Sequence, residues 1–300
     1  MPTDSKFTPE AVAPSRGASY LASTVRNAPV PRRLLTKVPE ITLVFWVLKL
    51  LTTGMGEAMS DFLGQKSVPL AGFIGFFGLC LALRLQLRQT VYRAPYYWFT
   101  VMMVAIFGTM VADGIHDGTG IGYQVTTPVF ALATAVIFFW WYRAEGTLSI
   151  HDVNSGRRER FYWAAVLATF ALGTAAGDLT ALALNLGFWA SVLIFAAIIS
   201  IPAIGWWRFN MNPIIAFWFA YVITRPLGAS FADGFSKTGN GGLGLGDGTV
   251  SAVTLVIFIA LVSWVTLTQR DVQAGHDAAV QRHPVPFLAP EPELLAPESD

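Results

Sequence analysis

The chain has 300 residues, of which 54% are hydrophobic and only 13% are charged, and its formal net charge is +1. A soluble domain carries about 25% charged residues, so this composition argues against a soluble enzyme domain. The near-zero net charge gives no support for nucleic-acid binding. The single cysteine, Cys80, excludes both an intrachain disulfide and a redox dithiol.

Eight apolar runs follow one another along the chain. A run of roughly 18 or more apolar residues with few charges is typical of a membrane-spanning helix. The expected spans are about 39–60, 68–84, 94–112, 124–142, 161–178, 185–205, 212–232 and 249–268. A buried soluble bundle is the alternative, but eight such runs favour an all-α polytopic membrane protein in a lipid bilayer. The polar segments 1–35 and 269–300 are expected to be disordered.

An internal repeat underlies the eight runs. Four tryptophans are each preceded by an aromatic residue and followed by a glycine ten residues later and an aspartate fifteen residues later. The four copies are Phe45, Trp46, Gly56 and Asp61; Tyr97, Trp98, Gly108 and Asp113; Tyr162, Trp163, Gly173 and Asp178; and Phe217, Trp218, Gly228 and Asp233. We therefore expect the membrane domain, 36–268, to be four parallel two-helix repeats. Their approximate ranges are 36–90, 91–150, 157–208 and 211–268.

Positive charges are distributed unequally between the two sides of the expected membrane. Of the 20 lysines and arginines, 16 lie in the two terminal segments or in the connections after the second, fourth and sixth helices. Lys66 and Lys237 alone fall in the opposite connections, while Lys49 and Arg225 fall inside helices. The positive-inside rule then predicts a multi-pass protein of the bacterial cytoplasmic membrane with both termini cytoplasmic.

The repeat predicts where its aromatic and acidic residues lie. The tryptophans are expected to lie near the cytoplasmic side of the membrane, where aromatic belts form. Fifteen residues carry a helix about 22 Å further, so each aspartate is expected near the outer boundary. One interpretation is that each aspartate has only a structural role in its hairpin. Four equivalent helices around one axis would instead gather Asp61, Asp113, Asp178 and Asp233 into a ring of oxygen ligands suited to a cation.

The second repeat adds two further possible ligands. His116 and Asp117 follow Asp113 by three and four residues, and a continuous helix would place all three on one face. A nitrogen ligand beside carboxylates suits Mn²⁺ or Zn²⁺ better than Ca²⁺. The alternative is a solvated loop histidine, because glycines at 114, 118 and 120 can end the helix.

The first and fourth copies differ from the other two. Thr53, Glu57 and Asp61 form one stripe of the first helix, and Lys49 lies nearer its start. Arg225, followed by a proline, lies inside the seventh helix. Ionisable groups at membrane depth usually pair or mark an ion path. We expect the first and seventh helices to be the working pair, with Thr53, Lys49 and Arg225 supporting transport. Glu57 and the repeat aspartates are the candidate partners of the two cations, which would act as internal counter-ions, although Lys49 could instead snorkel to the interface.

A resemblance supports the class of protein. The first repeat reads Lys37-Val38-Pro39-Glu40-Ile41-Thr42, then Phe45-Trp46, Lys49, Thr52-Thr53, Gly56-Glu57 and Asp61. This resembles the opening signature of a bacterial family of uncharacterised membrane-anchored proteins built from a repeat of unknown function. The resemblance covers all eight helices and implies membrane residence and repeats. It implies no substrate.

The sequence therefore predicts a cation transporter or exporter rather than an enzyme, since no Ser/His or Cys/His pair occurs at one depth. The expected partner is an inorganic cation, either a divalent metal such as Mn²⁺ as substrate or a proton-coupled ion. The predicted ligands are Glu57, Asp61, Asp113, His116, Asp117, Asp178 and Asp233. A membrane scaffold or sensor with structural aspartates is the alternative.

The charge distribution generates a topology prediction. Reporters fused after Arg88, after Arg158 and at the C-terminus should report a cytoplasmic location, because the basic connections stay inside. Reporters within 114–122 and 237–247 should report the opposite side. A C-terminal reporter on the outer side would contradict the eight-span arrangement.

Overall fold

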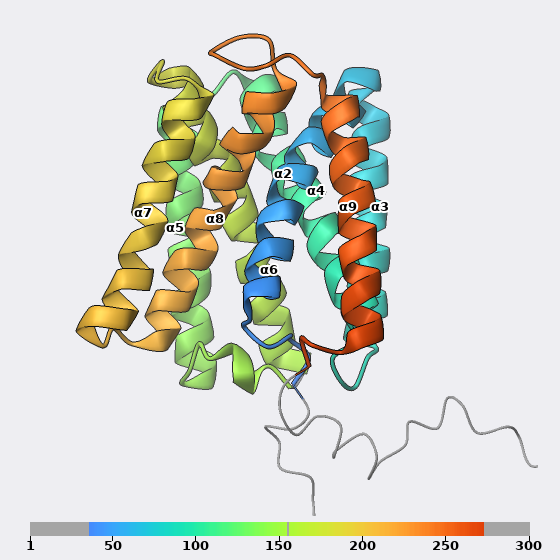
Figure 1. Ribbon diagram of the computed structural model, residues 1–300, viewed down its shortest axis with the longest axis vertical. Coiled ribbons are helices and arrows are strands. Elements are labelled where there is room, and N and C mark those ends of the chain that lie inside the picture. The colour runs from blue at the N-terminus through green and yellow to red at the C-terminus, as the bar shows by residue number, and fades with distance from the viewer. Residues whose placement is uncertain (1–35, 155, 273–300) are drawn as a thin grey trace, which may run out of the picture.

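The computed structural model describes residues 36–154 and 156–272, and these fold into an all-α bundle (Figure 1). Its long helices are α2 (Leu43–Lys66), α3 (Val68–Leu87), α4 (Ala94–Thr119), α5 (Tyr123–Glu145), α6 (Gly156–Asp178), α7 (Phe188–Phe209), α8 (Pro213–Ser236) and α9 (Asp247–Thr268). A 3₁₀ turn, Ile150–Asp152, precedes α6, and a π-helical turn, Leu179–Ala183, follows it. The eight predicted helices are confirmed. The segments 1–35 and 273–300, predicted to be disordered, lie outside the described residues.

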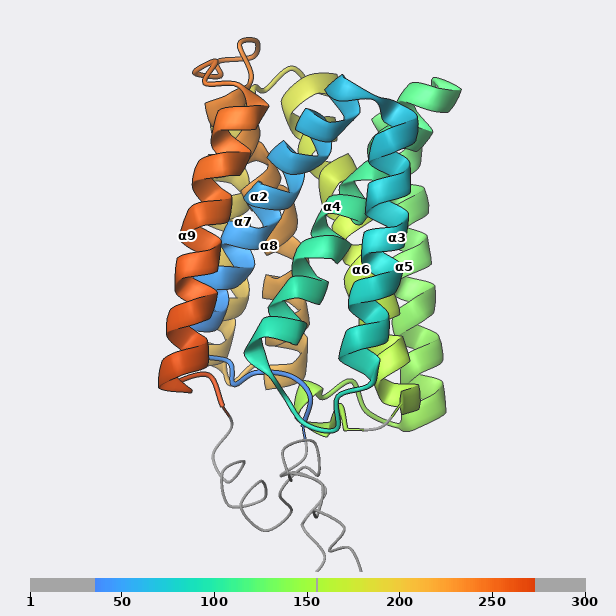
Figure 2. The same cartoon turned by 90° about the vertical axis from the view of Figure 1, so that its right-hand side faces the viewer.

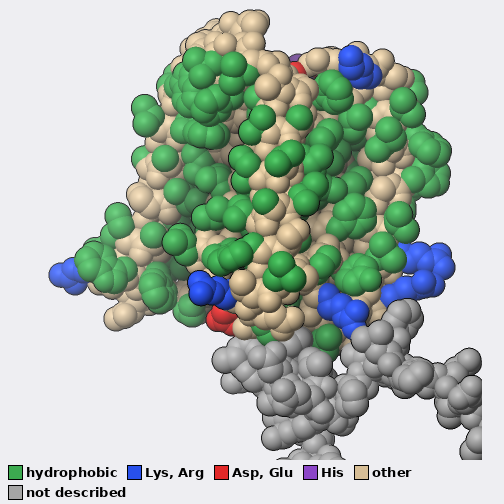
Figure 3. All heavy atoms as spheres, turned by 45° about the vertical axis from the view of Figure 1, so that its right-hand side comes forward, with side chains coloured by type: hydrophobic (Ala, Val, Ile, Leu, Met, Phe, Trp, Pro, Cys, Tyr) green, Lys and Arg blue, Asp and Glu red, His purple; other side chains and the backbone are tan. Residues whose placement is uncertain are grey.

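Seven of these helices are long and apolar enough to cross a membrane. The exception is α2, which carries Lys49, Glu57, Asp61 and Lys66 within its length. Figure 3 shows hydrophobic side chains over most of the height of one face, with most of the visible lysines and arginines towards its lower end. An apolar surface of this extent suits lipid rather than water. The protein is a polytopic all-α membrane protein.

The helices form an inner and an outer set (Figures 1 and 2). The inner helices are α2, α4, α6 and α8, and each packs on two others, with α8 returning to α2. The outer helices α3, α5, α7 and α9 pack most extensively on α4, α6, α8 and α2, respectively. The outer helix of each repeat therefore packs on the inner helix of the next repeat. Helix α9 of the fourth repeat packs on α2 of the first, which closes the circle.

A ring of aromatic side chains joins the inner helices near their N-terminal ends. Each aromatic that precedes a repeat tryptophan contacts the tryptophan of the next repeat. The ring centroids are 5.9 Å apart for Phe45–Trp98, 5.5 Å for Tyr97–Trp163, 6.1 Å for Tyr162–Trp218 and 5.8 Å for Phe217–Trp46. The fourth contact returns to the first repeat. Such pairs add about 0.5–1.5 kcal/mol each beyond burial of their area.

This ring corrects the expectation of an aromatic belt at the membrane surface. Phe45, Tyr97 and Tyr162 are buried, as are Trp98, Trp163 and Trp218, while Trp46 is partly exposed. The side chains face the bundle axis because the inner helices surround it, so they contact one another instead of lipid headgroups. The spacing predicts the position of the rings along the helices. It does not determine whether the rings point to the bundle axis or to the lipid.

The repeated glycines close a second circle. A Cβ built on Gly56 would lie 2.5 Å from Ala105 Cβ, and one on Gly108 would lie 2.7 Å from Phe170 Cβ. On Gly173 it would lie 2.1 Å from Arg225 Cγ, and on Gly228 it would lie 1.7 Å from Thr53 Oγ1. All four contacted residues are seven positions after a repeat tryptophan. The glycines therefore set the close approach of neighbouring inner helices.

The end of the bundle that carries the aromatic ring, here called the aromatic end, is tied together by the segment before α2. Lys37 Nζ lies 2.5 Å from Glu159 Oε2, and the Lys37 amide donates to Val153 O at 3.0 Å. Tyr92 donates to the Asp271 carboxylate, and Glu40 N donates to Asp271 O at 2.8 Å. The first residues of the predicted tail, 269–272, thus pack on the bundle.

The glycine circle generates a stability prediction. Gly228→Ala should lower the free energy of unfolding by about 1–3 kcal/mol, because the new methyl group would overlap Thr53. Chemical unfolding in detergent micelles measures it. Gly72→Ala in α3 is the matched control, because its Cβ would meet nothing within 4 Å. Equal effects of the two substitutions would contradict the close-approach role.

Candidate cation site

An acidic pocket opens at the opposite end of the bundle, here called the pocket end, which lies at the top of Figure 1. Its volume is about 410 Å³. The acidic residues that line it are Glu57, Asp61, Asp113, Asp117, Asp178 and Asp233. The four repeat aspartates thus converge on one cavity, as the spacing predicts for equivalent helices around an axis. Lys237 is the single lysine or arginine in the lining, among the described residues.

The α2 and α8 side of the pocket has the tightest grouping of acids. One carboxylate oxygen from each of Glu57, Asp61 and Asp233 can be chosen so that all three lie within 4.8 Å of one another. Glu57 and Asp233 are buried, with 2% and 4% of their surface exposed. Asp233 Oδ1 is buried and has no hydrogen-bond partner among the described residues. Three converging oxygens with an unused acceptor form a geometry that suits a hard cation.

The α4 and α6 side supplies Asp113, Asp117 and Asp178, together with Tyr123. Helix α4 continues through residue 119, so Asp113 and Asp117 do share a face. His116 does not join them in the pocket lining. Its ring stacks on Tyr123 with centroids 4.0 Å apart, and its Nδ1 lies 2.9 Å from Ile121 O. The side-chain donors of the described pocket are therefore dominated by oxygen, without the nitrogen ligand predicted from His116.

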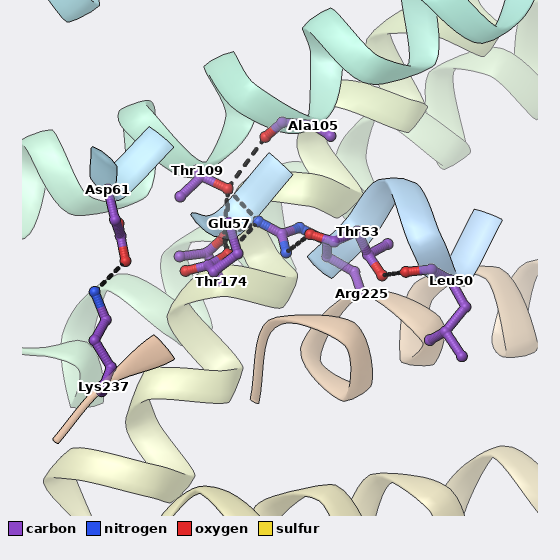
Figure 4. Close-up of polar contacts among 9 residues, drawn as sticks. All are labelled: Leu50, Thr53, Glu57, Asp61, Ala105, Thr109, Thr174, Arg225 and Lys237. Carbon is purple, nitrogen blue, oxygen red and sulfur yellow. Dashed lines mark hydrogen bonds and ion pairs between the residues drawn. The ribbon is translucent and has the colours of Figure 1, made fainter. Parts of the chain in front are cut away.

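Glu57, which lines the pocket, forms a buried ion pair with Arg225, which does not (Figure 4). Arg225 of α8 is fully buried, and its Nη2 lies 2.6 Å from Glu57 Oε2 of α2. The same nitrogen donates to the hydroxyl of Thr174 at 2.6 Å and to that of Thr109. Nη1 donates to Thr53 O at 3.1 Å. One guanidinium therefore joins all four inner helices at the axis.

The sequence predicts acidic partners for both buried cations, Lys49 and Arg225. The structure confirms an acidic partner for Arg225 but not for Lys49. Arg225 pairs with Glu57, as expected. Lys49 has no ion pair among the described residues. Its Nζ lies 3.9 Å from the ring centroid of Phe170 and 4.2 Å from that of Tyr221. Such contacts stabilise a cation by about 2 kcal/mol when desolvated. Lys49 is 1% exposed, so it does not snorkel to the interface.

Lys237 extends over the pocket from the loop that joins α8 and α9. Its Nζ lies 2.5 Å from Asp61 Oδ2 and 3.2 Å from Asp247 Oδ2. Burial alone lowers the pKa of Lys237, but the carboxylates of Asp61, Asp233 and Asp247 outweigh it and raise the pKa above its ordinary value. The side chain is therefore an ammonium ion that neutralises part of the acidic pocket.

Sequence reasoning missed several residues of this site. Thr109 and Thr174 occupy the repeat position of Glu57, eleven residues after the tryptophan, so the same spacing could have identified them. Lys237 was counted only for topology, and nothing in the repeat marks it, because it follows the last aspartate by four residues. Asp247 begins α9 and has no counterpart in the tryptophan-to-aspartate spacing. Thr53 acts through its backbone carbonyl rather than as a pocket-lining hydroxyl.

Fold and site together define a membrane protein of parallel two-helix repeats whose inner helices surround an acidic pocket. The chain belongs to the family described as Repeat of Unknown Function (DUF347), whose model matches residues 96–147, 161–212 and 216–271. These ranges correspond to the second, third and fourth repeats. The first repeat, with Lys49 and Glu57, lies outside them. No curated protein and no solved structure matches the chain.

The ion pair between Arg225 and Glu57 generates a second stability prediction. Arg225→Gln should lower the free energy of unfolding by about 3–5 kcal/mol, because it leaves Glu57 buried without its counter-charge. Adding Glu57→Gln to this variant should restore part of the loss, since neither charge then remains buried. Unfolding in detergent measures both variants, and exposed Arg160→Gln is the control. A double variant no more stable than Arg225→Gln would contradict the pairing.

Proposed function

We propose that the protein transports an inorganic divalent cation, with the acidic pocket as its binding site. The observation that carries the proposal is the convergence of Glu57, Asp61 and Asp233, whose carboxylate oxygens lie within 4.8 Å of one another beside an unused acceptor of Asp233. Ionisable groups at membrane depth are costly and usually mark an ion path. A ring of acids also concentrates cations from solution before they bind.

The donor set favours particular cations. Carboxylate oxygens suit Mg²⁺, Ca²⁺ and Mn²⁺, whereas Zn²⁺ usually takes nitrogen or sulfur ligands as well. His116 was the sequence's reason to include Zn²⁺, and it does not line the pocket. Mn²⁺ is consistent with the oxygen donors and serves as the probe cation in the experiments below.

The packing below the pocket favours a gated transporter over an open channel. A cation that leaves the pocket along the axis meets the Arg225 guanidinium first. Lys49, between Phe170 and Tyr221, and the aromatic ring also occupy the interior. Passage therefore requires a rearrangement in which Glu57 exchanges Arg225 for the transported cation. Arg225 would then act as the internal counter-ion of the empty carrier.

We further infer the orientation and location from charge. The described basic residues Arg88, Arg93, Arg157 and Arg158 belong to the aromatic end, and the positive-inside rule places that end in the cytoplasm. The pocket then faces outwards in this state. A bacterial cytoplasmic membrane is the proposed location.

The proposal predicts the effect of removing charge from the pocket. Glu57→Gln with Asp61→Asn should weaken Mn²⁺ binding by about 30-fold or more and bring Mn²⁺ flux to background, because two charged ligands are lost. Asp178→Asn should be milder, because its repeat has threonine rather than a second acid one turn away. Flux into reconstituted vesicles and binding to purified protein are the measurements.

The matched control is Glu40→Gln, which removes an acid at the aromatic end, far from the pocket along the bundle. It should leave binding and flux unchanged. Wild-type flux in the double variant would refute transport through this pocket. The scaffold interpretation, with structural aspartates, would then stand.

A further inference from the structure

The pocket already holds one cation, the ammonium group of Lys237. Its nitrogen lies 2.5 Å from Asp61 Oδ2, and Asp61 also belongs to the group of three converging acids. Two positive charges about 4 Å apart repel each other, most strongly where water is scarce. A second cation bound by Glu57, Asp61 and Asp233 therefore competes directly with Lys237 for Asp61.

The backbone of Lys237 is fixed at both sides, while its side chain has room to move. The Lys237 amide donates to Asp233 O at 2.9 Å, and Lys237 O accepts from Gly244 N at 2.8 Å. The rest of the loop is anchored as well, since Trp189 Nε1 donates to Gly241 O at 2.9 Å. The side chain itself is 32% exposed, so its flexible stem can carry the ammonium out to solvent.

A second acid, Asp247, lies beside Lys237. Its nitrogen lies 3.2 Å from Asp247 Oδ2, at the start of α9, and Gln65 donates to the same oxygen at 2.5 Å. Asp247 is not one of the residues lining the pocket. The ammonium can therefore leave Asp61 and keep a carboxylate partner outside the cavity. This makes displacement far less costly than exposing an unpaired lysine.

We propose that Lys237 is a tethered cation that occupies the Asp61 position of the empty pocket and is displaced by the incoming divalent cation. The proposal rests on the proposed cation site. It assigns Lys237 the role of an affinity-determining residue, because the incoming cation must replace the contact between the ammonium and Asp61. At the first hairpin of this end Lys66, next to Ser67, does not line the pocket, and the connections 120–122 and 184–187 contain no lysine or arginine. Among the described residues, a tethered lysine therefore reaches the pocket from the fourth repeat alone.

The test is Mn²⁺ binding to the purified full chain, measured by titration calorimetry. Lys237→Gln should bind Mn²⁺ about tenfold or more tightly than wild type, because no ammonium then competes for Asp61. Lys237→Arg keeps the tethered charge and should resemble wild type. Lys66→Gln, which removes the other lysine of the pocket end, should also resemble wild type, because Lys66 does not line the pocket.

The outcomes separate this proposal from the proposed function. Unchanged or weaker binding by Lys237→Gln, with binding intact in wild type, overturns the tethered-cation role alone. Equal tightening by Lys237→Arg overturns it too, because the effect would then not depend on charge. Absence of Mn²⁺ binding in every variant overturns the cation site itself.

A second measurement needs no substitution. Mn²⁺ should increase the labelling of Lys237 by an amine-acylating reagent several-fold in the wild-type protein, while Lys66 labelling stays constant. Mass spectrometry of peptides reads both sites at once. Constant labelling of Lys237 at saturating Mn²⁺ would overturn displacement even if Lys237→Gln fails to fold.

Discussion

The ion pair between Arg225 and Glu57 is the interaction on which the rest of the structure depends. A fully buried guanidinium costs several kcal/mol in desolvation, and a partner with good geometry and further hydrogen bonds must offset that cost. Glu57, Thr53, Thr109 and Thr174 supply these contacts from the other three inner helices. The pair therefore links the inner helices of all four repeats through one side chain, beside the acidic pocket that Glu57 lines.

The residues that all four repeats share build the bundle, and charged residues that differ between repeats complete the candidate site. Equivalent aromatic, glycine and aspartate positions build circles of contact that close on themselves, so four copies of one hairpin suffice to make the scaffold. The charged residues break that symmetry. Lys49 and Glu57 occur in the first repeat alone, and Arg225 and Lys237 in the fourth. Since α2 and α8 are neighbours in the closed circle, the chemistry gathers at the junction between the first and last repeats.

Much of this could be predicted from sequence because it depends on spacing along a helix. The eight helices and the common level of the aspartates follow from hydropathy and periodicity, and the pairing of Arg225 with Glu57 follows from the charges that interrupt the repeat. Contacts between helices do not. The sequence predicts that the aromatic rings lie at the membrane surface and that Lys49 pairs with an acid, and neither expectation matches the structure. Spacing along a helix gives the depth of a residue, but not which face of the helix points to the bundle axis. His116 likewise shares a helix with Asp113, yet it stacks on Tyr123 instead of lining the pocket.

The central claim is that the pocket binds a divalent cation through the junction of the first and last repeats. The most direct measurement is the anomalous scattering of Mn²⁺ in crystals of the protein. The account predicts an anomalous peak within coordination distance of Glu57, Asp61 and Asp233, with the Lys237 side chain turned away from Asp61. A pocket without such a peak, in protein shown to carry bound Mn²⁺, would contradict it.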